Sequence, residues 1–478
     1  MFLVVALVVG GTLCFLIPSL DGVDETSHFA RSYQVSTGDL LAIGSPTRSF
    51  HGGGVCLPRK FAIDLTAARF RAAVRNRAYA DGEADATTPP ASVQDLSPRE
   101  QQLLAQFEAG LTAALTPCRG AHAGKVFFDT STFAWYSPLP YLPSAAGVGV
   151  ARIVGLDFAG ILHLARFGQL LAFVGIVFLA IRRTPWAKWP LCAAGLLPLS
   201  LFVASTVTPD AITAAFAFLV VSSALRMTAR PTTMRAMLTE ALVLSAALAL
   251  CKPTYWIVTL AYLLPLLPLR SSTREIAGRP WFLLAPVVLA GGLSTLWQRS
   301  QRPLFVCDVR YFEVTPNPSR QVHLILTDPL HYVGNMAHGV RANAWNWVHD
   351  AAGIEVHLTH SWPGPLAVLI LVGFLALALQ RTTSDADVDL GPSRRALLLV
   401  TAVLGLVFVL TGLAVYCSAP GSLSTVFTNV RLLFAFFPLA FVALTAGRRH
   451  LVDRLPVPPA LGLIPFYAAA LIYVAVRV

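Results

Sequence analysis

The feature that most constrains this chain is a series of about eleven apolar stretches, each close to 20 residues long. A helix of about 20 apolar residues is long enough to cross the hydrocarbon core of a bilayer. We therefore predict an all-α polytopic membrane protein with about 11 transmembrane helices. The stretches are 2–20, 158–182, 189–207, 210–227, 236–251, 253–269, 281–298, 362–380, 396–416, 429–446 and 457–476.

Composition agrees with this class of protein. Of the 478 residues, 55% are hydrophobic and only 13% are charged, whereas soluble proteins average about 25% charged. The net charge of +11 would suit a nucleic-acid partner in a soluble protein. Here the basic residues fall mostly in short loops between apolar stretches, so orientation in the membrane explains them and no nucleic-acid partner is expected.

The basic residues alternate between successive loops. Every second loop carries three of them, at 182–188, 226–235, 270–279, 381–395 and 448–454. Because cytoplasmic loops hold the excess of Lys and Arg, this pattern places the N-terminus in the cytoplasm. Two long loops then fall on the extracytoplasmic side.

The predicted organisation has five parts. They are a retained first transmembrane helix at 1–20, an extracytoplasmic loop at 21–157, a transmembrane core at 158–298, a second extracytoplasmic loop at 299–361 and C-terminal transmembrane helices at 362–478. The first helix lacks the basic start and small-residue cleavage site of a signal peptide. The end of the first loop, 133–157, is aromatic and proline-rich, which predicts an interfacial segment.

Four cysteines lie in predicted extracytoplasmic parts, where disulfides are permitted. Cys56 and Cys118 share the first loop and form a plausible pair, while Cys307 and Cys417 also lie outside. Sequence alone does not fix the pairing.

The first predicted helix is followed by "DGVDETSHFARSYQVSTGDL" at 21–40. Asp21 or Asp24 can cap a helix that runs to about Ser36, with Gly38 ending it. Acidic groups at a helix N-terminus are stabilised by the helix dipole, by about 0.3–1 kcal/mol each. This structural interpretation accounts for the acids but not for the basic residues that follow them.

The alternative is a reactive cluster on that helix. Asp24, His28 and Arg31 share one face at helical spacing, and Glu25 lies beside His28. Such a cluster can take a proton and hold a phosphate. Glu25 and His28 could also bind a divalent metal, but two ligands are too few to define a site.

Three cationic residues are further candidates for substrate binding. Arg166 lies inside the second predicted span, where an arginine is usually kept for a pair, a ligand or a pathway, unless it reaches to the headgroups. Arg431 opens the tenth span from outside. Lys252, at the outer end of a span, has the alternative of serving as an interface anchor.

Asp210, Tyr136 and Tyr141 complete the set of candidates. Asp210 follows a proline at an outer helix start, where it can cap the helix or act as a second acid of the site. The two tyrosines either bind an acceptor or belong to the interfacial aromatic belt.

Motifs in this order resemble a bacterial family of predicted polytopic membrane proteins of unknown function. "VDETSHFARSYQVSTGDL" resembles its D-E-x-x-H-F-x-R-x-x-Q-x-S-x-G-x-L motif, and "YSPLPYLPSAAGVGVARIVGLDFAGILHLARF" and "PLSLFVASTVTPDAITAAFAF" are similar to later segments. "FTNVRLLFAFFPLAF" is similar to the last motif, in which Arg431 matches an arginine. Val430 and Leu432 replace the usual glycine and tyrosine there.

That family in turn resembles the GT-C class of glycosyltransferases, multispan enzymes that use polyprenyl-phosphate-linked sugars. The resemblance implies a GT-C-like fold with Asp24 as the catalytic base, and Glu25 as an alternative base or ligand. His28 and Arg31 would orient the acid or contact phosphate. The expected partners are the lipid bilayer, a polyprenyl-phosphate sugar donor and a glycan or lipid acceptor of the cell envelope, at the outer face of a bacterial plasma membrane.

Two other functions stay open from sequence. A transporter or flippase of lipid-linked sugars would place ionisable residues deep in several spans. A non-catalytic protein of envelope assembly would tolerate loss of Asp24, Glu25 and His28 together.

Overall fold

The computed structural model describes residues 1–46, 52–81, 116–229, 234–267, 281–307, 316–353, 364–379, 390–423, 430–445 and 462–477. Its α-helices are α1 (Phe2–Leu16), α2 (Glu25–Ser36), α3 (Arg59–Asp81), α5 (Leu142–Val154), α6 (Phe158–Arg183), α7 (Lys188–Gly195), α8 (Pro198–Ala204), α9 (Pro209–Ala229), α10 (Met234–Cys251), α12 (Trp281–Gln301), α13 (Pro318–Thr327), α14 (Pro329–Ala352), α15 (Gly364–Ala378), α16 (Gly391–Cys417), α17 (Phe437–Thr445) and α18 (Leu463–Arg477). Its 3₁₀ segments are η2 (Gly120–His122), η3 (Leu139–Tyr141), η4 (Tyr255–Leu266), η5 (Arg302–Leu304) and η7 (Val430–Phe436).

Every apolar stretch found in the sequence contains helical structure. Within the described ranges, the helices α6, α9 and α16 are long and apolar enough to cross a membrane. Shorter apolar helices lie among them, including α1 and η4. The molecule is therefore a helical membrane protein, while eleven crossings and their orientation stay predictions.

The predicted span 189–207 is divided into α7 and α8. The break falls at Leu197, whose backbone is extended, just before Pro198. A proline disfavours helical backbone at the residue before it and has no N–H to continue the ladder. Both short helices are buried among other helices, which is where interrupted helices are tolerated in membrane proteins.

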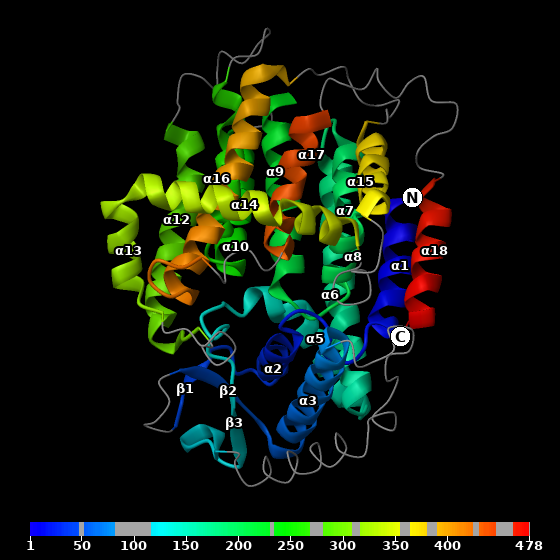
Figure 1. Ribbon diagram of the computed structural model, residues 1–478, viewed down its shortest axis with the longest axis vertical. Helices are drawn as coiled ribbons and strands as arrows, with labels where there is room; N and C mark the ends of the chain where they lie inside the picture. The colour runs from blue at the N-terminus through cyan, green and yellow to red at the C-terminus, as the bar shows by residue number, and fades with distance from the viewer. Residues whose placement is uncertain are drawn as a thin grey trace.

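Among the described residues, the buried hydrophobic side chains form two large cores and a small third cluster of Val35, Tyr141 and Ala145. The larger core lies within the bundle and centres on α9, which is buried along most of its length. The smaller core joins α2, α3 and the sheet to α5 and the start of α6. Figure 1 shows this second unit at one end of the bundle, and α14 running crosswise over the bundle helices.

A small antiparallel sheet corrects the all-α prediction. It has the order β1 (Ile43–Gly44), β2 (Gly53–Pro58) and β3 (Lys125–Asp129). Gly54 pairs with Asp129, and a Cβ on Gly54 would lie 2.4 Å from the carbonyl oxygen of Phe128. The strands are too short to give a clear alternating pattern in the sequence, which is why helical periodicity dominated the prediction.

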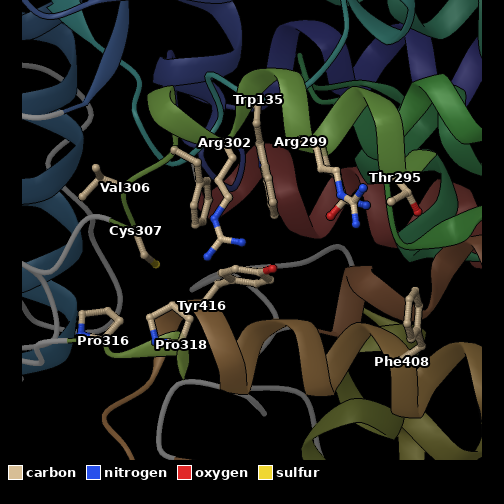
Figure 2. Close-up of a pocket in the computed structure, with 12 residues that line it drawn as sticks. Trp135, Thr295, Arg299, Arg302, Val306, Cys307, Pro316, Pro318, Phe408 and Tyr416 are labelled. Atoms are coloured by element: carbon tan, nitrogen blue, oxygen red, sulfur yellow. The ribbon is translucent and has the colours of Figure 1, made fainter. Parts of the chain in front are cut away.

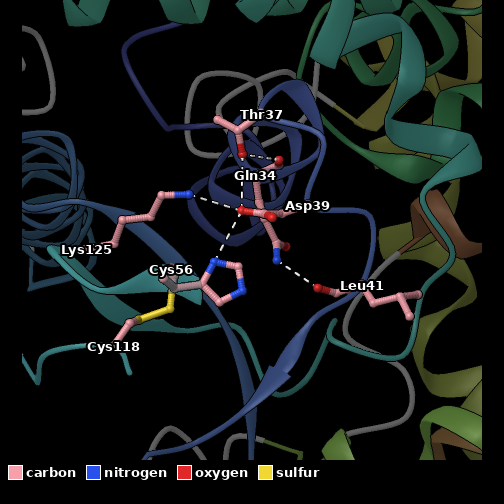
Figure 3. The surroundings of a disulfide bond; sticks show 8 residues. Gln34, Thr37, Asp39, Leu41, Cys56, Cys118 and Lys125 are labelled. Atoms are coloured by element: carbon pink, nitrogen blue, oxygen red, sulfur yellow. Dashed lines mark hydrogen bonds and ion pairs between the residues drawn. A yellow bond between two sulfur atoms is a disulfide. The ribbon is translucent and has the colours of Figure 1, made fainter. Parts of the chain in front are cut away.

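Two disulfides hold the parts that were predicted to lie outside. Cys56 of β2 bonds to Cys118, as the sequence suggested, and Cys307 bonds to Cys417 at the end of α16. Beside the first disulfide, Asp39 accepts a hydrogen bond from Lys125 at 3.1 Å, as Figure 3 shows. These contacts attach the sheet to the end of α2.

The predicted interfacial segment forms η3 and α5. Helix α5 packs closely on α6, because Gly147 and Gly168 let the two backbones meet: a Cβ on Gly147 would lie 2.1 Å from the oxygen of Leu164. Its other face exposes Val150, Ile153 and Val154. An amphipathic helix with an exposed apolar face suits the surface of a bilayer.

Candidate functional site

Four of the predicted site residues meet at one point of the structure. Asp24 precedes α2, Asp210 lies in the first turn of α9, Lys252 follows α10, and Arg431 lies in η7. We call these four residues the charged cluster. It contains two carboxylates and two cations, drawn from segments that lie far apart in the sequence.

Arg431 joins the two carboxylates of the charged cluster. Its guanidinium donates to the Asp24 carboxylate, and its Nε lies 3.8 Å from Oδ2 of Asp210. It also donates to the backbone oxygen of Val23 at 2.6 Å. The arginine that was singled out in the last sequence motif thus contacts the segment of the first motif.

Asp24 occupies the N-cap position of α2 but does not cap the helix with its side chain. Its backbone is left-handed, with φ of 57°, a conformation that costs a non-glycine residue about 1 kcal/mol or more. With the backbone in this conformation, the Asp24 carboxylate points at Arg431. The side chain is 39% exposed, although Arg431 beside it is only 8% exposed.

The charge of Asp24 is stabilised by its neighbours. Burial of the surroundings favours the neutral acid, but the attraction of Arg431, with a further contribution from Lys252, outweighs it and holds the pKa of Asp24 below its usual value. Asp24 is therefore an anion at neutral pH.

Asp210 and Lys252 form the closed half of the charged cluster. Nζ of Lys252 lies 2.6 Å from Oδ1 of Asp210, and the two side chains are 7% and 3% exposed. Thr208 donates to Oδ2 of Asp210 at 2.9 Å. The position of Asp210 in the first turn of α9 adds the stabilisation of the helix dipole.

Aromatic rings border the charged cluster. Lys252 Nζ lies 5.6 Å from the ring centre of Tyr136 and 5.4 Å from that of Tyr255, within the range of cation–π attraction. The ring of His28 stacks near Tyr136, and its Nδ1 shares a 2.9 Å hydrogen bond with the hydroxyl of Tyr141.

His28 and Tyr141 are both kept neutral at physiological pH. Burial lowers the pKa of His28 to about 3, despite the opposing attraction of Asp24. Burial likewise raises the pKa of the Tyr141 hydroxyl well above its usual value. A neutral imidazole bonded to a neutral phenol can position neighbours and exchange hydrogen bonds, but it adds no cation to the site.

Glu25 lies next to Asp24 in sequence but forms a different ion pair, with Arg166. Its carboxylate accepts from Arg166 Nε at 2.8 Å and Nη2 at 2.6 Å, and from the backbone N–H of Val207 at 3.0 Å and Gly22 at 3.2 Å. Both side chains of the Glu25–Arg166 pair are 0% exposed.

Arg166 uses its remaining donors on the end of α1. It donates to the backbone oxygens of Cys14, Ile17 and Pro18, at 3.2, 2.6 and 2.8 Å. This pair therefore fastens α2 and α6 to the chain that leaves α1. Because these donors and acceptors are all used, the contacts favour a structural role over the catalytic role expected for Glu25 and the substrate-binding role expected for Arg166.

Arg31 also lies apart from the charged cluster. Its guanidinium donates to Gln34 and, at 2.6 Å, to the backbone oxygen of Leu40. Burial lowers the pKa of Arg31 to about 10. The helical spacing that joined Asp24, His28 and Arg31 holds for the backbone, but the arginine side chain supports the turn after α2.

Sequence reasoning missed Thr208 and the role of Tyr255. Thr208 lies two residues before Asp210 in "TPD", a spacing typical of Ser and Thr side chains that bond near a helix start. Tyr255 follows Lys252 by three residues, and its hydroxyl donates to the Leu432 oxygen at 2.9 Å. That contact attaches η4 to η7 beside the charged cluster.

No group of three or more potential metal ligands occurs among the residues that the structure describes. His28 and Glu25, the pair considered as ligands, direct their side chains at Tyr141 and Arg166 respectively. In this arrangement the two side chains do not share a position where a metal ion could bind.

The fold and the charged cluster define a helical membrane protein with a polar site at one end of its bundle. Residues 7–427 match the family described as "Predicted membrane protein (DUF2142)". The chain therefore belongs to this family of membrane proteins of unknown function. Neither the curated proteins nor the solved structures contain a match to it.

Proposed function

We propose that the protein is an integral membrane glycosyltransferase that moves a sugar from a polyprenyl-phosphate donor to an acceptor hydroxyl. The observation that carries the proposal is the partly exposed Asp24 carboxylate, held beside Arg431 in a cluster that also contains Lys252. The site would lie at the extracytoplasmic face of a bacterial cell membrane, with a glycan or lipid of the envelope as acceptor.

The reaction needs a base and a cationic group within reach of each other. The acceptor oxygen forms a bond to the anomeric carbon and gives its proton to the Asp24 carboxylate. The bond between the anomeric carbon and the phosphate oxygen breaks, and the electron pair leaves with the polyprenyl phosphate. Arg431 and Lys252 supply positive charge for that leaving group.

The contact between Arg431 and Asp24 suggests how the donor prepares the base. A bound phosphate competes with Asp24 for the Arg431 guanidinium, because both are anions that accept its hydrogen bonds. As Arg431 turns to the phosphate, Asp24 loses the attraction that holds its pKa low, and its basicity increases. The base would thus be strongest when the donor is in place.

The resemblance of this family to the GT-C class, noted from the sequence, supports the same assignment. GT-C enzymes carry an acidic residue in the first outer loop, and Asp24 follows α1 in the same way. Asp210 with Lys252 would then fix the position of Arg431, and Tyr136 and Tyr141 would border the acceptor. Glu25 and Arg166 have no chemical step in this proposal.

The test uses the full chain in liposomes with radiolabelled polyprenyl-phosphate sugars and a membrane extract as the acceptor. We expect the native protein to yield labelled product. The transfer rate of Asp24→Asn should be about 10²–10⁴-fold lower. The matched control is Asp39→Asn, which removes an acid that contacts Lys125 on the sheet. It should transfer normally.

Two outcomes would contradict the proposal. One is transfer at the native rate by Asp24→Asn. The other is movement of the lipid-linked sugar between leaflets with its sugar–phosphate bond intact, which would favour the transporter or flippase function.

A further inference from the structure

A cavity separate from the charged cluster lies between the ends of α12 and α16 and the loop that carries Trp135. Its volume is about 500 Å³, within the range of about 300–1,000 Å³ that small-molecule sites occupy. Figure 2 shows side chains from these segments pointing into it. Its lining includes Trp135, Arg299, Arg302, Phe305 and Tyr416.

Three aromatic rings form one wall of this cavity. Trp135 stacks on Phe305 with ring centres 4.1 Å apart, and Tyr416 meets both rings edge-on at 5.9 Å. Each ring therefore keeps a position set by the other two. Fixed aromatic faces suit flat or ring-shaped ligands, whose C–H groups pack on them without large loss of entropy.

Two arginines give the cavity a positive charge. Arg302 lies over the ring of Tyr416 at 5.8 Å, and Arg299 points into the same space (Figure 2). Within the described part of the chain, the lining includes no aspartate or glutamate. The lining residues that the structure describes thus carry a charge of +2, whereas the charged cluster has equal numbers of cations and carboxylates.

An unused hydrogen-bond donor adds to this pattern. The indole N–H of Trp135 is buried and has no acceptor among the residues that the structure describes. Leaving a buried donor unpaired costs about 1–3 kcal/mol. The N–H lies beneath the surface of the wall, so a ligand oxygen in the cavity would become its acceptor only after a shift of the ring.

The disulfide Cys307–Cys417 joins the two sides of this cavity. Cys307 follows Phe305 by two residues, and Cys417 directly follows Tyr416. The bond therefore holds the rings and Arg302 at a fixed separation. Tyr136 links the wall to the charged cluster, because Trp135 stacks on its ring and Lys252 Nζ lies 5.6 Å from the centre of that ring.

We propose that this cavity binds an anionic saccharide, a sugar ring that carries a phosphate or a carboxylate. The aromatic wall packs on the sugar ring, and Arg299 and Arg302 bind the anionic group. As an acceptor site, the cavity rests on the proposed function, because only a glycosyltransferase needs an acceptor next to the charged cluster. The binding itself does not depend on that reaction.

Calorimetry on the purified full chain tests the binding. The probes are glucose 1-phosphate, glucuronate and neutral glucose, with farnesyl phosphate to represent the lipid phosphate of a donor. We expect both anionic sugars to bind at least about tenfold more tightly than glucose. Farnesyl phosphate should not displace bound glucuronate, because the lipid phosphate is expected at the charged cluster. Equal affinity for glucose, displacement of glucuronate by farnesyl phosphate or absence of binding would each overturn the proposal.

Substitutions locate the binding. Arg299→Gln with Arg302→Gln should weaken glucuronate binding about tenfold or more. Arg341→Gln makes the same change at an exposed arginine of α14 and should leave binding unchanged. Arg431→Gln should also leave it unchanged. Loss of binding in Arg431→Gln but not in the double variant would assign the ligand to the charged cluster and overturn the proposal.

The two proposals can fail separately. If Asp24→Asn stops transfer while the double variant binds glucuronate normally, the cavity assignment is wrong and the proposed function stands. If the double variant loses binding while Asp24→Asn transfers normally, the cavity is an anionic-saccharide site in a protein with another function.

Discussion

Asp24 and Glu25 are consecutive acids, yet the structure gives them opposite surroundings. Glu25 is fully buried, and four donors occupy its carboxylate. Asp24 is 39% exposed, and its charge is balanced by Arg431, an arginine of the distant η7 segment. The Glu25–Arg166 pair therefore stabilises the fold, whereas the Asp24–Arg431 pair leaves a carboxylate accessible to a ligand.

The same contrast holds for the two arginines. Arg166 donates to Glu25 and to three backbone oxygens at the end of α1. Arg431 is shared between Asp24, the oxygen of Val23 and the more distant Asp210. A guanidinium that spans two carboxylates can exchange one of them for a phosphate, whereas a guanidinium used on every side cannot do so without unfolding its surroundings.

The largest expected effect comes from breaking the Glu25–Arg166 pair. Glu25→Gln leaves Arg166 as a buried cation with no carboxylate, so we expect the free energy of unfolding to fall by about 3–5 kcal/mol. Denaturant unfolding in detergent measures the loss. The double variant Glu25→Met with Arg166→Met removes both charges and should recover much of it. Native stability in Glu25→Gln would contradict the structural role.

The next effect is a pH dependence from His28. Since burial lowers the folded-state pKa of His28 to about 3 from an unfolded value near 6.5, its contribution to stability is complete above pH 6.5. That contribution is lost progressively as the pH falls from 6.5 towards 3, by up to about 1.4 kcal/mol per pH unit. His28→Gln should show a shallower decline over this range. An unchanged pH profile of unfolding would contradict a buried neutral histidine.

A smaller effect is expected from the closed half of the charged cluster. Lys252→Met leaves Asp210 with Thr208 and Arg431, so we expect a loss of about 1–3 kcal/mol rather than the full cost of a buried unpaired charge. Denaturant unfolding measures it against Glu25→Gln. A loss equal to that of Glu25→Gln would mean that the Asp210–Lys252 pair is as structural as the Glu25–Arg166 pair. The charged cluster would then not differ from the Glu25–Arg166 pair in this respect.

The smallest effect is expected at Asp39. Its contact with Lys125 is partly exposed, and ion pairs of this kind contribute about 0–1 kcal/mol. Asp39→Asn should therefore unfold within about 1 kcal/mol of the native protein, and its stability should respond weakly to salt. A larger loss would show that the link from α2 to the sheet carries more of the stability than its exposure indicates.

The sequence was most informative where a pattern is local. The apolar stretches located the helices. The helix expected after Asp21 or Asp24 and up to about Ser36 is α2, with Gly38 beyond its end, although the Asp24 side chain does not cap it. The Cys56–Cys118 bond was also proposed correctly. These features depend on periodicity, capping and redox environment, which short segments carry by themselves.

The direction of each side chain could not be read in this way. Helical spacing put Asp24, Glu25, His28 and Arg31 near one another, but tertiary packing sent Glu25 to Arg166 and Arg31 to the Leu40 oxygen. The meeting of Asp24 with Arg431 joins positions 407 residues apart. The position of Pro198 could have revealed the break between α7 and α8, because a proline beyond the first turn of a helix removes a ladder hydrogen bond.

The most direct test compares Asp24→Asn with Glu25→Gln in one preparation, with sugar transfer and unfolding measured on both. We expect Asp24→Asn to transfer sugar about 10²–10⁴-fold more slowly and to unfold within about 1 kcal/mol of the native protein. We expect Glu25→Gln to lose transfer only through its loss of stability. Transfer at the native rate by a folded Asp24→Asn protein would contradict the assignment of Asp24 as the base.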